Sequence, residues 1–236
     1  MSKWRDLEQR LEKHLRLGRR PVAVAFLQVA PGNVPKFTGN EPSGCSFWRL
    51  AAEGRVFYTV PADHYNCAVG SYTHNLPLPA ERAGEMDETL RMMYRSGYLR
   101  PEDVAAIPRL ARAPEAIVYA ALGETPAEPS VVLFACQPAT AMLLQEAAIR
   151  AGKSAPLPPL ARPTCMALPA ALAQGTTTSL GCIGNRVYTG LGSDELYVAV
   201  PGADLEEIAG ALEVIAAANA QLADYARARR EQLSST

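Results

Sequence analysis

Four of the five cysteines occur in two stretches of similar pattern, and thiols are the side chains of this sequence best suited to chemistry. The first stretch holds Cys45 and Cys67, and the second, about half a chain later, holds Cys165 and Cys182. Each stretch runs through a Cys, a short Ala- and Leu-rich segment, a Gly, a linking segment and a second Cys, followed by a Gly and a Tyr-Thr pair. We therefore expect an internal repeat in which Cys45 corresponds to Cys165 and Cys67 to Cys182.

A pseudo-two-fold relation between the two stretches would bring the four sulfurs to a common axis. Four thiolates complete the coordination of an iron-sulfur cluster or of a zinc ion. Structural zinc sites commonly pair two cysteines a few residues apart, and no Cys-x-x-Cys occurs here. The pattern predicts a metal or iron-sulfur cluster binding protein in redox, electron transfer or cofactor handling. Its metal ligands would be Cys45, Cys67, Cys165 and Cys182, with an iron-sulfur cluster as cofactor and zinc as the alternative.

A second interpretation stays open, because free cysteine is often buried for packing alone. In that case the cysteines are scattered, and one thiol of low pKa serves a cofactor-free enzyme or a small-molecule binding protein. Cys136 lies outside the two stretches, at the end of an expected strand, and is assigned to the core. Metal content separates the two interpretations.

Polar residues near the cysteines are candidates for holding a cofactor. An arginine there would favour thiolates and compensate the negative charge of a cluster, while a histidine would ligate a metal or move a proton near neutral pH. The ordinary alternatives are a salt bridge for the arginine and a hydrogen-bonded loop position for the histidine. The candidate cofactor-binding residues are Arg162, Asn185, Arg186, His64 and His74.

Composition narrows the class of protein. The chain has 236 residues, of which 48% are hydrophobic and 20% charged, and this is enough for one substantial core. A formal net charge of -1 without long runs of Lys and Arg argues against nucleic-acid binding. No apolar run approaches the roughly 20 residues of a membrane span, and the first residues lack the apolar core of a signal peptide. We expect a cytoplasmic protein without membrane association, acting with a redox partner or a small-molecule ligand.

Hydrophobic periodicity predicts an alternation of strands and helices. Short Val-rich or aromatic runs indicate strands near 21–27, 55–60, 116–122, 131–136 and 195–200. Helical spacing indicates helices near 2–17, 47–52, 81–96, 140–151 and 203–232, and Pro101 indicates the start of a short helical piece at 101–103. In the helix near 81–96, the spacing of Met86, Leu90 and Met93 predicts one buried face. The segments around Cys67 and Cys182 are expected to be loops because Gly is frequent in them.

The predicted fold is α/β, with α+β as the alternative, in a single domain spanning 1–236. Two pseudo-repeated halves, 18–80 and 115–202, would form one compact unit with a mixed sheet and flanking helices. A helical connector over 81–110 joins the halves, and a C-terminal helix over 203–232 follows them. Apolar residues of that helix recur three and four positions apart, at Leu205, Ile208, Leu212, Ile215 and Leu222. This seam packs within the chain or pairs with a second copy, which would make a homodimer.

Four segments together resemble the uncharacterised ArCR family, a family of bacteria and archaea whose domain has no known function. They are Gly44-Cys-Ser-Phe-Trp-Arg-Leu-Ala51, Asp63-His-Tyr-Asn-Cys67 with Gly70-Ser-Tyr-Thr-His-Asn75, Arg162-Pro-Thr-Cys-Met-Ala167 and Leu180-Gly-Cys-Ile-Gly-Asn-Arg-Val-Tyr-Thr-Gly-Leu191. The resemblance covers nearly the whole chain and includes the four cysteines. It implies a single-domain soluble protein and does not by itself assign a role.

Overall fold

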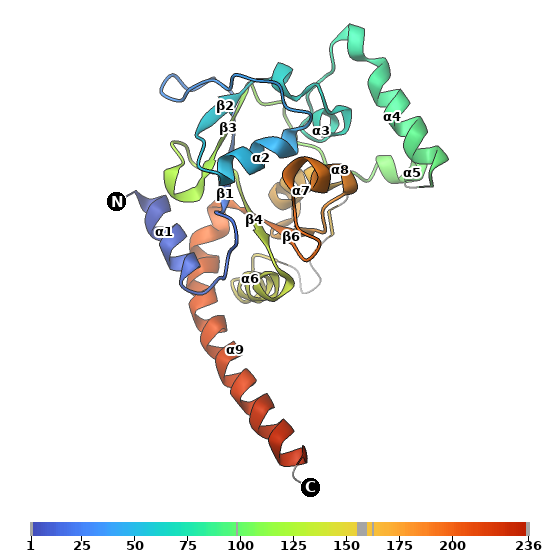
Figure 1. Ribbon diagram of the computed structural model, residues 1–236. Helices are drawn as coiled ribbons and strands as arrows, with labels where there is room; N and C mark the ends of the chain where they lie inside the picture. The colour runs from blue at the N-terminus through green and yellow to red at the C-terminus, as the bar shows by residue number, and fades with distance from the viewer. Residues whose placement is uncertain (1, 98, 155–159, 162, 235–236) are drawn as a thin grey trace.

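A six-stranded sheet lies between two layers of helices in the computed structural model, which describes residues 2–97, 99–154, 160–161 and 163–234 (Figure 1). The strands are β1 (Val22–Leu27), β2 (Phe57–Thr59), β3 (Ala116–Ala121), β4 (Val131–Cys136), β5 (Thr177–Ser179) and β6 (Leu196–Pro201). Their order across the sheet is β2-β3-β1-β4-β6-β5. The predicted α/β class, a sheet with flanking helices, is confirmed.

The pairing within the sheet differs from the mixed arrangement that the sequence predicted. Every ladder between the named strands is antiparallel. Within the described residues, parallel pairing is limited to two isolated bridges, Lys36 to Tyr58 and Leu160 to Thr178. A run of apolar residues indicates that a strand is buried, but it does not indicate whether the strand is parallel or antiparallel to its neighbours. That direction depends on how the connections return the chain to the sheet.

The helices are α1 (Lys3–Glu12), α2 (Gly44–Ala52), α3 (Ala68–Thr73), α4 (Gly84–Arg95), α5 (Pro101–Val104), α6 (Pro138–Arg150), α7 (Ala167–Gln174), α8 (Ile183–Thr189) and α9 (Leu205–Ser234). Short 3-10 turns are η1 (Pro61–His64), η2 (Ala80–Arg82), η3 (Leu122–Glu124), η4 (Thr164–Met166) and η5 (Gly202–Asp204). The predicted helices are present with shifted ends, whereas α3 and α8 occupy segments that were expected to be loops.

The period-two alternation of β4 sends its side chains to both helical layers. Leu133 and Ala135 join the core beneath α2 and α7. Val132 and Phe134 join the core beneath α1, α6 and α9. Cys136 is buried in this second core, on the face opposite α2 and α7. It is therefore a packing residue, as the sequence predicted.

The strands and helices of the two cysteine-bearing stretches come in a similar, not identical, order. β1, α2, β2, α3 and β3 come first, and β4, α6, α7, β5, α8 and β6 follow. β1 and β4 are neighbours at the centre of the sheet, while β2 and β5 form its two edges. Helices α4 and α5 fall inside the first succession, between α3 and β3. Helix α2, which begins beside Cys45, and helix α7, which follows Cys165, cover the same face of the sheet.

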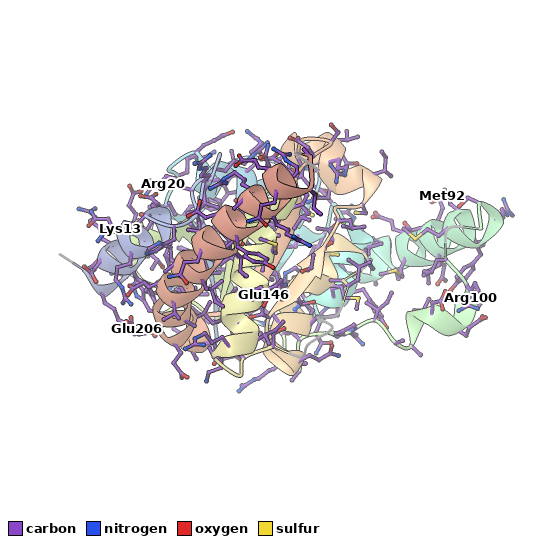
Figure 2. All side chains as sticks on the ribbon, turned by 90° about the horizontal axis from the view of Figure 1, so that it is seen from below. Lys13, Arg20, Met92, Arg100, Glu146 and Glu206 are labelled. Carbon is purple, nitrogen blue, oxygen red and sulfur yellow. The ribbon has the colours of Figure 1, made fainter. Side chains whose placement is uncertain are left out.

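Helices α4 and α5 form an arm that projects from the body of the molecule (Figures 1 and 2). No residue of α4 is buried, which differs from the buried face predicted for this helix. Its apolar residues Met86, Leu90 and Met93 instead line a small hollow against Val69 and Tyr72. The arm therefore rests on α3 through a half-buried apolar contact and contributes nothing to the main core.

Helix α9 has a buried first part and a projecting second part. Leu205, Ile208 and Leu212 are buried against the sheet. Beyond Ile215 the helix extends away from the body, toward the C-terminal end of the chain in Figure 1. No helix in the described part of the chain is long and apolar enough to cross a membrane.

Candidate functional site

The four cysteines of the two stretches line one cavity of about 450 Å³. Its walls come from the start of α2, from α3, from the η4 turn, from α8 and from the arm helix α4. Cys45, Cys67, Cys165 and Cys182 thus share one space although more than a hundred residues separate the first from the last. No described residue of the lining carries a charged side chain.

Two of the cysteines lie on the buried side of the cavity. Cys45 is the second residue of α2, and Cys165 lies in the η4 turn that leads into α7. Both are buried. The thiol of Cys165 donates to the carbonyl oxygen of Val69, with 3.9 Å between sulfur and oxygen. This contact joins the second stretch to α3, the helix that follows Cys67 of the first stretch.

The other two cysteines are half-buried and stand at the start of short helices. Cys67 is the N-cap of α3, and its sulfur accepts the amide N–H of Gly70 at 3.3 Å. Cys182 is the N-cap of α8, and its own amide donates to the hydroxyl of Thr164 at 2.6 Å. That bond places Cys182 beside the η4 turn containing Cys165. Each stretch therefore contributes one cysteine at the start of an apolar helix or in the turn leading into it, and one N-cap.

Burial keeps three of the thiols protonated in the folded protein. Desolvation, with the neighbouring thiols adding to it, raises the pKa of Cys45 to about 12. Desolvation and the other three sulfurs raise the pKa of Cys165 well above its ordinary value. Desolvation also raises the pKa of Cys67, partly offset by the Gly70 amide. The cavity therefore disfavours an isolated thiolate unless a bound cation compensates its charge.

Two neutral polar side chains, Asn185 and Ser43, complete this part of the cavity. Asn185 on α8 is only 2% exposed, and Ser43, the N-cap of α2, is 3% exposed. Both line the cavity. The two amide atoms of Asn185 and the hydroxyl of Ser43 make no hydrogen bond within the described part of the chain. Asn185, predicted as a cofactor-binding residue, is thus in position to contact a bound group.

Arg186 has a structural environment. Its guanidinium donates to the carbonyl oxygens of Leu180 and Gly192, and to that of Glu195 at 3.0 Å. These three bonds hold the loops before and after α8 together, and Arg186 does not line the cysteine cavity. Arg162, the other predicted arginine, lies outside the described residues.

His64 and His74 form a buried pair beneath the start of α2. Their ring centroids are 5.7 Å apart, and neither lines the cysteine cavity. The Nε2 atom of His64 lies 2.8 Å from the hydroxyl of Thr59. The Nδ1 of His74 donates to the carbonyl of Gly70 at 2.7 Å, and its Nε2 has no partner among the described residues. Burial lowers the pKa of both histidines, so both are neutral near pH 7.

Sequence reasoning missed the apolar rim of the cavity. Met92 on α4 and Ile183 and Tyr188 on α8 line its mouth. Met92 lies on the projecting arm in Figure 2, and Ile183 is 74% exposed. Spacing of four between Ile183 and Val187 is the helical signal that the glycines of this segment concealed. The mouth is therefore apolar and open to solvent.

The four thiols are not arranged around a single ion. Among the described residues, no group of three or more His, Cys, Asp or Glu side chains would hold one metal ion. Tetrahedral zinc with Zn–S bonds of about 2.3 Å requires sulfurs roughly 3.8 Å from one another. The sulfurs here surround a space instead of meeting at a point.

The family of the chain follows from comparison with known proteins. Residues 10–211 match the uncharacterised ArCR family, the domain of unknown function DUF169. The chain belongs to this family. The resemblance found in the four sequence segments is thereby confirmed, and the match includes all four cysteines of the cavity.

One curated relative of this ArCR chain is an uncharacterised protein of Methanocaldococcus jannaschii. It is 27% identical over 186 residues, which cover 73% of this chain and 77% of that protein. No solved structure matches the chain. Neither the family description nor the relative's name states an activity, so the functional argument depends on the cavity itself.

Proposed function

We propose that this ArCR protein binds an iron-sulfur cluster in the cavity, with Cys45, Cys67, Cys165 and Cys182 as ligands, and that it acts in redox chemistry, electron transfer or cofactor handling. The observation that carries the proposal is the single cavity of about 450 Å³ lined by all four cysteines. Cluster irons are ligated by four thiolates, and a cluster occupies volume between its ligands where a single ion does not.

The burial of the thiols supports the same proposal. Neutral thiols around an open apolar space stabilise one another little. Iron ions, in contrast, displace the thiol protons and form strong bonds with the resulting thiolates. The two N-cap cysteines precede short helices that contain Gly70 and Gly184. Ligands on separate elements can adopt the spacing that a bulky cofactor requires. Zinc remains the alternative metal, and it would require the four sulfurs to move together.

A reactive cysteine in a cofactor-free enzyme is the second candidate function. A nucleophilic thiol requires a lowered pKa, commonly from a nearby cation. Burial instead raises the pKa of Cys45, Cys67 and Cys165, and no described lining residue is cationic. No observation therefore favours this candidate over a bound cluster.

The decisive experiment measures metal and acid-labile sulfide on protein purified without oxygen, together with its visible absorption spectrum. Iron and sulfide in stoichiometric amount with a brown colour are expected. Colourless protein with one zinc per chain would replace the cluster by a zinc site. Protein without either metal, with one cysteine dominating the reaction with iodoacetamide, would overturn the proposal in favour of the nucleophile.

The proposal also concerns location and partners. We propose the reducing cytoplasm as its compartment, because thiols there stay available to bind metal. A redox partner or a small-molecule ligand would approach at the apolar mouth formed by Met92, Ile183 and Tyr188. The oligomeric state proposed is a homodimer through the projecting part of α9, where Leu222 and Tyr225 are exposed.

A further inference from the structure

The environment of Cys45 contains two buried side chains whose hydrogen-bonding capacity is unused. Asn185 presents an amide nitrogen and oxygen, and Ser43 presents a hydroxyl, none of them bonded within the described residues. A buried polar atom without a partner destabilises the folded protein. The amide nitrogen of Asn185 and the hydroxyl of Ser43 are thus free to donate to a group bound in the cavity, and the amide oxygen of Asn185 is free to accept.

Asn185 and Ser43 line the same cavity as Cys45. Asn185 and Ser43 each favour the charged form of Cys45 and so oppose the large rise that burial causes in its pKa. The neighbouring hydroxyls already donate elsewhere. The hydroxyl of Tyr197 donates to that of Thr189 at 3.3 Å, and the hydroxyl of Thr189 donates to the backbone carbonyl of Asn185 at 2.8 Å.

We propose that Asn185 and Ser43 are positioning residues that donate hydrogen bonds to the Cys45 sulfur once it ligates the cluster, and that they raise the reduction potential of the cluster. The inference rests on the proposed cluster. Reduction adds negative charge to the cluster and its thiolates, and donors to the ligating sulfur stabilise the reduced form more than the oxidised form.

The absence of charge in the cavity makes these donors important. No described lining residue is cationic, so neutral donors must stabilise the added electron. The amide N–H of Gly70 already contacts the sulfur of Cys67 at 3.3 Å. Within the described residues no backbone amide donates to the sulfur of Cys45, and the side chains of Asn185 and Ser43 fill the equivalent role.

The test uses full-length protein loaded with its cluster under anaerobic conditions. Asn185→Leu removes the amide at nearly constant volume, and Ser43→Ala removes one oxygen. Ser46→Ala is a matched control, because Ser46 is also fully buried with an unpartnered hydroxyl and is next to Cys45 in the sequence, yet it does not line the cavity. The potential is measured by titration with dithionite, followed by visible absorption and electron paramagnetic resonance.

The expected result is a lower reduction potential in both cavity variants and an unchanged potential in Ser46→Ala. Loss of one donor should change the one-electron reduction equilibrium threefold to tenfold, and tenfold corresponds to about 59 mV. An unchanged potential in Ser43→Ala with the cluster retained would overturn the inference, even if Asn185→Leu fails to fold. An equal shift in Ser46→Ala would overturn it too, because the effect would then come from the fold in general.

The failure of this inference is distinguishable from the failure of the proposed function. Wild-type protein without iron and sulfide overturns both. Iron-loaded protein whose potential does not respond to Ser43→Ala and Asn185→Leu overturns only the role of these two side chains.

Discussion

The sulfur of Cys165 lies 3.9 Å from the carbonyl oxygen of Val69, and this contact joins the two cysteine-bearing stretches. Val69 is in the first turn of α3, two residues after Cys67. Residues 96 positions apart in the sequence are thus neighbours at the cavity. The contact requires β1 and β4 to lie side by side at the centre of the sheet, because that pairing places α3 and the η4 turn together.

The first prediction concerns the four cysteines individually. Changing Cys45, Cys67, Cys165 or Cys182 to Ser should reduce bound iron to a small fraction of the wild-type amount, because a hydroxyl is a poor ligand for cluster iron. Cys136→Ala is the matched control, since Cys136 is buried on the opposite face of the sheet. Iron content per folded chain, with folding checked by circular dichroism, measures the effect. Normal iron content in any two of the four serine variants would contradict the ligand assignment.

The second prediction concerns pH and metal retention. Burial raises the pKa of Cys45 to about 12 and raises that of Cys165 as well, so metal binding must release thiol protons at neutral pH. Protons therefore compete with metal, and retention should strengthen as the pH rises. Each proton displaced changes the apparent affinity about tenfold per pH unit. Metal release to a chelator, corrected for the chelator's own titration and followed between pH 6 and 9, should slow steadily. Release that is independent of pH would show that the ligands are already thiolates in the metal-free protein.

The third prediction concerns the buried histidine pair. Desolvation, strengthened by His74, lowers the pKa of His64 well below its ordinary value, and desolvation lowers that of His74. The unfolded chain binds these protons near pH 6.5 while the folded protein does not. Stability is therefore full above about pH 6.5 and falls below it, by up to about 1.4 kcal/mol per pH unit for each histidine.

Urea unfolding of metal-free protein between pH 5 and 8 measures this slope. His74→Leu should reduce this slope by the contribution of about one proton. The variant also loses the hydrogen bond from Nδ1 to Gly70, which lowers its stability at every pH and leaves the slope comparison valid. His14→Gln is the control, because His14 is only half-buried and lies in the turn after α1, away from the histidine pair. A slope that stays the same in His74→Leu would show that His74 is protonated in the folded state.

Much of this fold can be predicted from the sequence because its strands are short runs of apolar residues. β3 and β4 are fully buried, and their runs of apolar residues predicted them almost to the residue. The seam of α9 was equally clear, and Ile208 and Leu212 do pack on the sheet. A local pattern of apolar residues is sufficient to predict a strand or helix where that element is completely buried.

The sequence predicted that the four cysteines lie together, but it did not predict what surrounds them. The two similar Cys-bearing stretches suggested one common site, and the four cysteines do line one cavity. The helices α3 and α8 were expected as loops, because Gly70 and Gly184 lower helical propensity. Tertiary contacts with α2 and the η4 turn override that propensity. The role of Asn185 beside Cys45, and the structural role of Arg186, depend on contacts between elements that no local pattern shows.

The fourth prediction concerns the proposed homodimer. Leu212 is buried in the core, so a charge there would unfold the chain without testing an interface. Leu222 is 66% exposed on the projecting part of α9, and Leu222→Glu should leave folding intact while halving the mass at high concentration. Sedimentation equilibrium over a range of concentrations measures the mass. Gln221→Glu, one position away, is the matched charge control. A monomeric wild-type protein at all concentrations would contradict the dimer.

The fifth prediction separates the charge of Arg186 from its geometry. The guanidinium bonds three carbonyl oxygens, including that of Glu195, and a lysine ammonium cannot reproduce this planar set of donors. Arg186→Lys keeps the positive charge, while Arg186→Gln removes it. If the bonds fix the loops around α8, both variants should lose stability to a similar extent, on the order of 2–3 kcal/mol, and both should bind less iron because Cys182 is displaced. If the charge itself compensated the cluster, Arg186→Lys would keep its iron and Arg186→Gln would not. Parallel urea unfolding and iron analysis of the two variants distinguish these outcomes, and we expect lysine to fail as glutamine does.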